Sequence, residues 1–251
     1  MRHILAVELK SSVCNLRFLC GVLLVFLSAL IVGQPYAKQL LEAGYSAEGV
    51  GWFLVYTYCM TAGNALMFIP IAAPFAAGGN AELELRSRFS LFYCSRTGKK
   101  SYIWGKTFGA AVSGGLMVCL AMLLVLGATV LWVRKVPLME GAEVHVSKMV
   151  LAMILSLIRG FLNGAFWAVA GSLSAVITRN RYLAYAVPFI LYYVLTIFQE
   201  RYYQKLFFLS PRYWAAPVYY SNFFCIGILL VCTLAAAFLL MWAMKRRLDH
   251  A

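Results

Sequence analysis

The sequence predicts an all-α membrane protein with six membrane-spanning helices, and three observations support this fold class. Residues of the set AVILMFWYC make up 63% of the 251 residues, against roughly 45–50% apolar residues in soluble domains. The 22 Lys and Arg and the 9 Asp and Glu gather in short clusters. The runs between these clusters are long enough to cross a bilayer, which takes about 20 residues. These features exclude a soluble enzyme and predict a single transmembrane domain over residues 1–251.

Residues 1–16 are expected to form a helix that lies in the membrane interface. Apolar and charged residues alternate there, as they do in helices at the headgroup boundary. One alternative is a disordered basic tail. Another is a cleaved signal peptide that includes the first apolar run, but no clear cleavage site follows this run, which favours a retained anchor.

The six predicted spans are stretches without charge, apart from Arg159 in the fourth. They cover residues 18–34, part of 50–77, part of 107–133, 149–178, 182–198 and 223–244. The second, third and fourth stretches exceed the bilayer thickness, so these helices must tilt, kink or protrude. Pro70 and Pro74 predict a kink near the end of the second span.

Lys and Arg residues indicate the orientation of the spans. If the N-terminus is cytoplasmic, the inner segments hold twice as many of them as the outer segments, as expected for cytoplasmic loops. The inner ones are Arg2, Lys10, Arg17, Arg86, Arg88, Arg96, Lys99, Lys100, Lys106, Arg179, Arg181, Lys245, Arg246 and Arg247. Both termini are therefore expected in the cytoplasm of a multi-pass cell membrane protein. A basic rim beside anionic lipid accounts for the net charge of +13 without nucleic acid.

The chain has no pattern that predicts an enzyme. Its one aspartate is Asp249, and the spans contain no Asp, Glu, Lys or His, which argues against catalysis in the membrane and against an ion-coupled carrier. The seven cysteines are scattered, so neither a disulfide framework nor a zinc site is expected. Gly105-Lys106-Thr107 matches the end of a P-loop, but Lys100 stands where the first glycine is required. Any energy for transport must therefore come from a partner.

Arg159 and Asn163 are candidates for a translocation path, because they lie one helical turn apart in the fourth span. The alternative is a structural role for Arg159, either snorkelling to the interface or bonding to loop carbonyls. In both cases we expect it to contact protein or water rather than lipid. Gly160, Gly164 and Ala168 follow at four-residue steps, a stripe that allows another helix to approach closely.

Residues 79–106 mix charged and apolar residues between the second and third spans. An amphipathic helix there, with Leu85, Phe89 and Phe92 over Arg86, Arg88 and Arg96, would suit docking of a soluble protein. The alternative is a solvated loop with no partner.

Three segments resemble the permeases of ABC-2 type transporters. The first runs from the second span through Glu82, Glu84 and residues 94–102 (CSRTGKKSY) to Lys106, and is similar to the family's coupling helix region. The second is GSLSAVITRN at residues 171–180, followed by Ala184 and Pro188, which is similar to a tight cytoplasmic hairpin. The third, residues 199–222, is rich in aromatic residues and is similar to the family's short external helices.

The resemblance implies a permease that works with a separate ATPase chain. Two permease copies would face each other above two ATPase subunits, and ATP and Mg would bind to the ATPase. The implied coupling residues are Glu82, Glu84, Arg86, Arg88, Phe89, Phe92 and Arg96. We expect residues 199–222 to dip into the outer leaflet as two short pieces, with Tyr203, Phe207 and Trp214 as candidates for an external gate.

The substrate class suggested by the apolar spans is an apolar or amphipathic molecule such as a peptide, lipid or drug. Two other functions stay open. One is a membrane immunity or sensor protein that binds a peptide without transporting it. The other, which ranks third, is a secondary carrier.

Overall fold

The computed structural model describes residues 2–46, 50–61, 63–87, 89–137 and 145–249, and the elements in these ranges are helical. Within them, five helices are long and apolar enough to cross a membrane. They are α2 (Leu16–Ala43), α8 (Lys99–Val133), α9 (Val146–Thr178), α10 (Leu183–Tyr202) and α12 (Asn222–Asp249). Long apolar helices in this number are typical of a multi-pass membrane protein.

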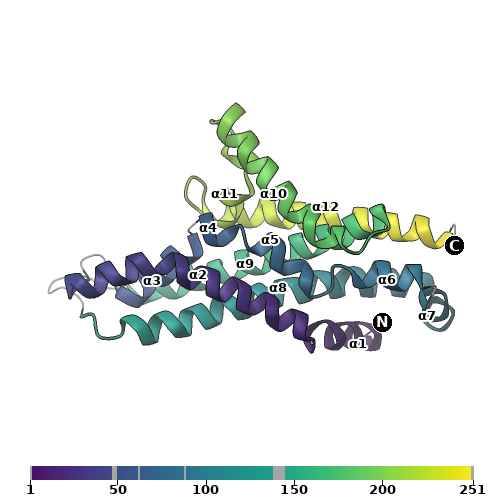
Figure 1. Ribbon diagram of the computed structural model, residues 1–251, viewed down its shortest axis with the longest axis horizontal. Helices are drawn as coiled ribbons and strands as arrows, with labels where there is room; N and C mark the ends of the chain where they lie inside the picture. The colour runs from purple at the N-terminus through teal and green to yellow at the C-terminus, as the bar shows by residue number, and fades with distance from the viewer. Residues whose placement is uncertain (1, 47–49, 62, 88, 138–144, 250–251) are drawn as a thin grey trace.

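The long helices form an elongated bundle (Figure 1). α2, α8, α9 and α12 run along its long axis, and α10 rises from it at an angle. Both chain termini lie at one end, together with α6 (Asn80–Arg86) and α7 (Phe89–Thr97). We call this the terminal end of the bundle and the other the opposite end.

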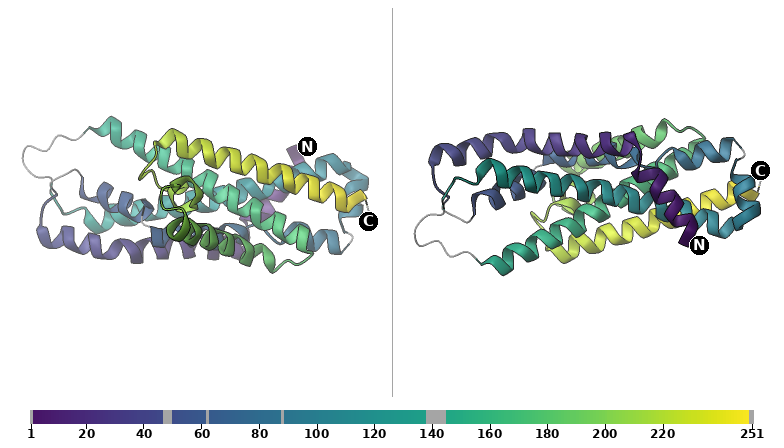
Figure 2. Two further views of the ribbon diagram at one scale, coloured as in Figure 1. Left: turned by 90° about the horizontal axis from the view of Figure 1, so that it is seen from above. Right: turned by 90° about the horizontal axis from the view of Figure 1, so that it is seen from below.

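Small residues bring α8 and α9 into close contact, as the stripe in the fourth span predicted. A Cβ added to Gly164 would lie 2.4 Å from the carbonyl oxygen of Gly114, and a Cβ added to Gly114 would lie 2.3 Å from the Cβ atom of Ala168. Side chains at these positions would push the two backbones apart. α9 also packs along α12, so α9 is at the centre of the bundle (Figure 2).

The second predicted span is not one continuous helix, which corrects the expectation of six long helices. Its residues form α3 (Gly51–Thr61), α4 (Gly63–Leu66), α5 (Ile69–Ala72) and the 3-10 helix η1 (Ala73–Phe75). Pro70 and Pro74 lie in the first turns of α5 and η1, where the missing N–H group breaks no helical hydrogen bond. The predicted kink is therefore a series of breaks, and we call residues 51–75 the interrupted segment.

The interrupted segment extends along the bundle from the opposite end toward the terminal end. A Cβ added to Gly51 would lie 3.3 Å from Val133, the last residue of α8. Shortly after the segment, a Cβ added to Gly79 would lie 3.4 Å from that of Arg181, in the turn between α9 and α10. The segment thus covers a distance similar to that of the long helices, although it is broken (Figure 1).

α1 (Arg2–Val13) is the helix expected before the first span, and a bend at Cys14 and Asn15 separates it from α2. It packs on α8 through the polar residues Glu8 and Ser12, which are buried, while Val7 is 58% exposed. A helix is thus present in the segment for which one was expected. The alternation of apolar and charged residues did not show that its polar side would face the bundle.

α2 extends beyond the predicted end of the first span. It passes Gln34 and continues with Pro35 inside it to Ala43. Gly44 then ends the helix with φ of 75°, and its N–H donates to the carbonyl of Leu40, which is a common glycine C-cap.

Residues 199–222 form the end of α10, the 3-10 helix η2 (Phe207–Leu209) and α11 (Pro211–Ala215), so two short helical pieces are present in this segment. α11 packs on α9, α10 and α12. The carbonyl of Ala215 accepts a hydrogen bond from Arg159, which lies about 20 Å along α9 from its start at a rise of about 1.5 Å per residue. α11 therefore lies well inside the length of the bundle rather than beyond its end, while the end of α10 rises away from the bundle (Figure 1).

Candidate functional site

The region predicted to contain one coupling helix contains two, α6 and α7. α6 ends at Arg86, and the hydroxyl of the next residue, Ser87, donates to the carbonyl of Glu84 at 3.3 Å, a local bond that competes with continuation of the helix. α7 is followed by Gly98, with φ of 82° and ψ of 144°, a conformation that glycine adopts readily and other residues do not. Because α8 begins at Lys99, Gly98 sets the direction of α7 relative to α8.

Four side chains, which we call the lysine cluster, join three helices at the terminal end. Lys106 of α8 places its Nζ 2.7 Å from Oε1 of Glu8 in α1 and 2.5 Å from Oε1 of Glu84 in α6. The hydroxyl of Tyr102 donates to Oε2 of Glu84 at 3.0 Å. The side chains of Lys106 and Glu8 are only 6% and 10% exposed. Because an unpaired buried charge is strongly destabilising, α1, α6 and α8 are held together as one unit.

A second ionic contact attaches α6 to α12 and α9. The guanidinium of Arg247 in α12 bonds to the carboxylate of Glu82, which is 2% exposed, and donates to the carbonyl of Val176 in α9 at 3.1 Å. Nearer the surface, Nζ of Lys99 lies 3.1 Å from Oδ1 of Asp249. α6 is thus bonded, directly or through one side chain, to most of the helices at this end.

The predicted coupling residues divide into two groups. Glu82 and Glu84 are bonded within the bundle. Four others are exposed and form what we call the coupling surface: Arg86, Phe89, Phe92 and Arg96. Phe92 is 74% exposed. Arg88 lies outside the described residues. The acidic residues therefore anchor α6, and the arginine and phenylalanine residues are free to meet a partner.

Sequence reasoning missed Glu8, Tyr102 and Arg247 as parts of this site. The sequence contains one indication of the role of Glu8, because this is the only acidic residue before Glu42 and it had no predicted partner. The sequence contains no such indication for Arg247, because it is one of three consecutive basic residues at the end of the last span.

Tyr93 connects α7 to the lysine cluster. Its ring centroid lies 5.6 Å from that of Tyr102. Burial raises the pKa of Tyr93, the nearby carboxylate of Glu8 raises it further, and Lys106 opposes this effect. The phenol therefore stays neutral and contributes packing rather than charge.

Arg159 and Asn163 are both buried but have different neighbours. Arg159 donates to the carbonyl of Ala215 at 3.3 Å and to the side chain of Asn222. Its neighbours are thus protein groups, as predicted, and it ties α9 to α11 and α12. Asn163 accepts a hydrogen bond from Nε1 of Trp167 at 2.9 Å.

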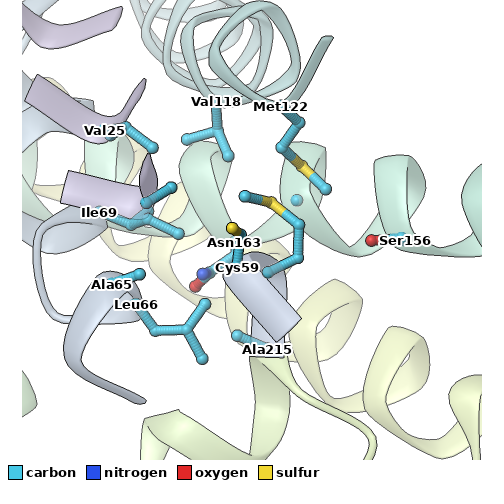
Figure 3. A pocket seen from close by; sticks show the side chains of 13 residues that line it. Val25, Cys59, Ala65, Leu66, Ile69, Val118, Met122, Ser156, Asn163 and Ala215 are labelled. Carbon is cyan, nitrogen blue, oxygen red and sulfur yellow. The ribbon is translucent and has the colours of Figure 1, made fainter. Parts of the chain in front are cut away.

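Asn163 also lines a cavity of about 30 Å³, shown in Figure 3. The cavity lies between α2, α8, α9 and the interrupted segment, and its lining is mostly apolar, with Ser156 as a second polar residue. It has room for about one water molecule. Arg159 is not among its lining residues, so the two translocation candidates do not line one path in this conformation.

The three gate candidates lie in separate surroundings. Tyr203 is 47% exposed, with its ring centroid 5.1 Å from that of Phe198. Phe207 stacks on Tyr219 at 4.0 Å. Trp214 is buried beside α9. The structure does not bring these rings together into one plug.

Among the described residues, no three His, Cys, Asp or Glu side chains gather as metal ligands would. Comparisons with protein-family models, with curated proteins and with solved structures find no match to this chain. The function is therefore argued from the residues and contacts described above.

Proposed function

We propose that this chain is the membrane permease subunit of an ATP-driven ABC-2 type exporter. The family comes from the resemblance of residues 82–106, 171–188 and 199–222. The observation that carries the proposal is the bonding of α6, because the lysine cluster and the Glu82 to Arg247 contact connect it to α1, α8 and α12. Pressure on α6 and α7 would therefore move several helices together, as coupling to an ATPase requires.

In this proposal the terminal end of the bundle faces the cytoplasm, where the excess of Lys and Arg belongs. The interrupted segment is then the sixth crossing. Both termini lie at the same end of the bundle (Figure 1), and an even number of crossings returns the chain to the side on which it started. With five long helices crossing once each, the interrupted segment supplies the sixth.

The partner proposed for the coupling surface is a cytoplasmic ATPase subunit. Phe89 and Phe92 supply exposed apolar contact area, while Arg86 and Arg96 supply charge. ATP and Mg would bind to that subunit. A second copy of this chain would complete the transporter.

The proposed substrate is apolar or amphipathic, such as a peptide, lipid or drug. The lining of the cavity beside Asn163 is mostly apolar, which supports this class. With room for about one water molecule, the cavity would have to widen before a substrate could pass. Movement of α8 and α9 driven from α6 is the proposed cause of that widening.

Purification of the chain from its native membrane tests the proposal. We expect an ATPase to copurify, with ATP turnover that falls when the chain is removed. The double variant Phe92→Ala with Arg96→Ala should weaken this association. Its matched control, Tyr45→Ala with Lys135→Ala, removes an exposed ring and an exposed charge at the opposite end and should leave the association unchanged.

Capture of a peptide without any ATPase would contradict the exporter and support the immunity or sensor function. If both double variants lost the ATPase to the same extent, the coupling surface would not be the site at which the ATPase binds.

A further inference from the structure

The end of α9, the end of α6 and the last turns of α12 line a groove that shares only Arg86 with the coupling surface. One hollow, of about 600 Å³, is lined by Arg179, Trp242 and Arg246 among others. An adjoining hollow of about 150 Å³ is lined by Arg86, Arg179 and Arg181 among others. Arg179 lines both, and we call the two hollows together the arginine groove.

The arginine groove has positive charge that is not neutralised. Its one acidic lining residue, Glu82, is already bonded by Arg247. In the part of the chain that the structure describes, Arg86, Arg179 and Arg246 have no carboxylate within ion-pair distance. Guanidinium groups that converge without an acidic partner bind phosphate well, because their paired N–H donors match its oxygens.

Two aromatic side chains indicate where the groove would lie in a membrane. The guanidinium of Arg246 lies 5.7 Å from the centre of the Trp242 ring, and that of Arg181 lies 4.9 Å from the centre of the Tyr182 ring. Trp and Tyr are enriched at the level of lipid headgroups. The groove would therefore meet headgroups rather than acyl chains.

Apolar side chains continue from the groove along α12. Phe238 and Leu239, about one helical turn before Trp242, are 66% and 49% exposed, and Leu234 one turn further is 62% exposed. A phosphate in the groove would thus lie directly above an apolar surface of the kind that acyl chains cover. A free anion has no apolar part that could cover this surface.

The backbone at Arg179 supports a role for its side chain. Among the described residues it is the only one other than glycine with a positive φ, at 56°. Glycine or asparagine adopts this left-handed conformation more easily than arginine does. The backbone conformation of the turn therefore does not account for an arginine at position 179.

We propose that the arginine groove binds the phosphate of an anionic phospholipid whose acyl chains lie along α12. The site requires only that the terminal end lies at the headgroup level, so it rests on the membrane placement proposed above. Arg86 also belongs to the coupling surface, but lipid binding to the groove needs no ATPase. Its occupant would hold the α9 to α10 turn against α12.

The test measures lipid binding to the purified full-length chain in detergent by native mass spectrometry. The probes are phosphatidylglycerol and phosphatidylcholine with identical acyl chains. The test variant is Arg179→Asn with Arg246→Gln. Asparagine suits the left-handed backbone at position 179, so the variant should fold as well as the original chain. The control, Arg134→Gln with Lys135→Gln, removes equal charge at the opposite end.

We expect phosphatidylglycerol to bind in preference to phosphatidylcholine. Its affinity should fall about tenfold or more in the test variant, since two cationic contacts to an anionic lipid are lost, and should not change in the control. Equal binding of the two lipids, or equal losses in the two variants, would overturn the proposal.

A second measurement distinguishes binding of a phospholipid from binding of free phosphate. Dihexanoyl phosphatidylglycerol should raise the thermal midpoint of the original chain, because a ligand that binds only the folded state stabilises it. If inorganic phosphate at the same concentration raises the midpoint as much, the site takes a free anion and the lipid proposal is wrong. If the test variant keeps the lipid but loses a protein partner, the groove is a protein docking site instead.

Discussion

Lys106 is the residue on which the order of the terminal end depends. It is one buried cation between two carboxylates from different helices, so the three groups carry a net charge of −1. The hydroxyl of Tyr102 partly offsets this imbalance by donating to Glu84. Removing the lysine would leave Glu8 and Glu84 close together without a cation, in a region with little water to screen them.

Replacing Lys106 with methionine should destabilise the chain by about 3–5 kcal/mol, the usual effect of removing one partner of a buried ionic contact. For a chain of this size that corresponds to a loss of roughly 6–20 °C in the thermal midpoint. Thermal unfolding in mild detergent, followed by tryptophan fluorescence, measures this change.

The matched control for that substitution is Lys99→Met. Lys99 and Asp249 are 55% and 47% exposed, and exposed pairs contribute at most about 1 kcal/mol. Similar losses in the two variants would mean that the lysine cluster adds no more stability than a surface ion pair.

Arg159 should matter more for the position of the outer segment than for overall stability. Arg159→Met removes the bonds to Ala215 and Asn222 but also removes a buried charge, and these effects oppose each other. We expect a change in the thermal midpoint of a few degrees at most, together with faster trypsin cleavage after Arg212, which is exposed in α11. The control Arg134→Met should leave the cleavage rate unchanged, and slow cleavage in both variants would show that other contacts hold α11.

At the scale of elements, α7 depends on the backbone conformation of Gly98. A Cβ added there meets no atom within 4 Å, and the same is true of Gly44. Any effect of alanine at these positions therefore comes from the backbone alone. Gly44, with φ of 75° and ψ of −8°, lies nearer the left-handed helical region than Gly98, with φ of 82° and ψ of 144°.

Gly98→Ala should therefore destabilise the chain by about 1–3 kcal/mol, and Gly44→Ala should have a smaller effect. Only Gly98→Ala should also weaken ATPase association, because it alone reorients the coupling surface. Thermal midpoints and copurification measure the two effects. Full association with alanine at position 98 would mean that α7 can dock in more than one orientation.

The elements that the sequence predicted well are those whose signal is composition. Long apolar runs identified α8, α9, α10 and α12, and the spacing of small residues in α9 predicted the close approach of another helix but not that this helix is α8. The breaks in residues 51–75 were only partly predicted. Apolar composition is the same in continuous and broken helices, and Pro70 and Pro74 indicate the later breaks but not the end of α3 at Thr61.

The lysine cluster was beyond sequence reasoning for a different reason. Glu8 and Lys106 are 98 residues apart, and their contact depends on how α1 turns back at Cys14 and Asn15. The direction of that turn follows from packing on α8, which residue patterns do not encode. For the same reason the acidic residues of the coupling region were predicted without their roles as anchors.

At the scale of the whole molecule, the position of the termini restricts the number of crossings. Both termini lie at the terminal end (Figure 1), which five single crossings would not allow. Between Tyr45 and Arg96 the described residues form the interrupted segment, α6 and α7, and no long apolar helix is found among them. Whether these two residues lie on opposite sides of the membrane therefore decides whether a broken segment crosses it.

Cysteine labelling in intact cells should place Tyr45 and Arg96 on opposite sides. In a background without the native cysteines, Tyr45→Cys and Lys205→Cys should react with a membrane-impermeant maleimide. Arg96→Cys and Lys245→Cys should react only after the cells are permeabilised. All four residues are exposed in the structure, so a lack of reaction would reflect the membrane rather than burial.

Labelling of both position 45 and position 96 from outside would leave five crossings and place the coupling surface where no cytoplasmic ATPase could reach it. The exporter proposal would then fail together with the sixth crossing, because in that proposal one crossing by the broken segment brings both termini, α6 and α7 to the cytoplasmic side.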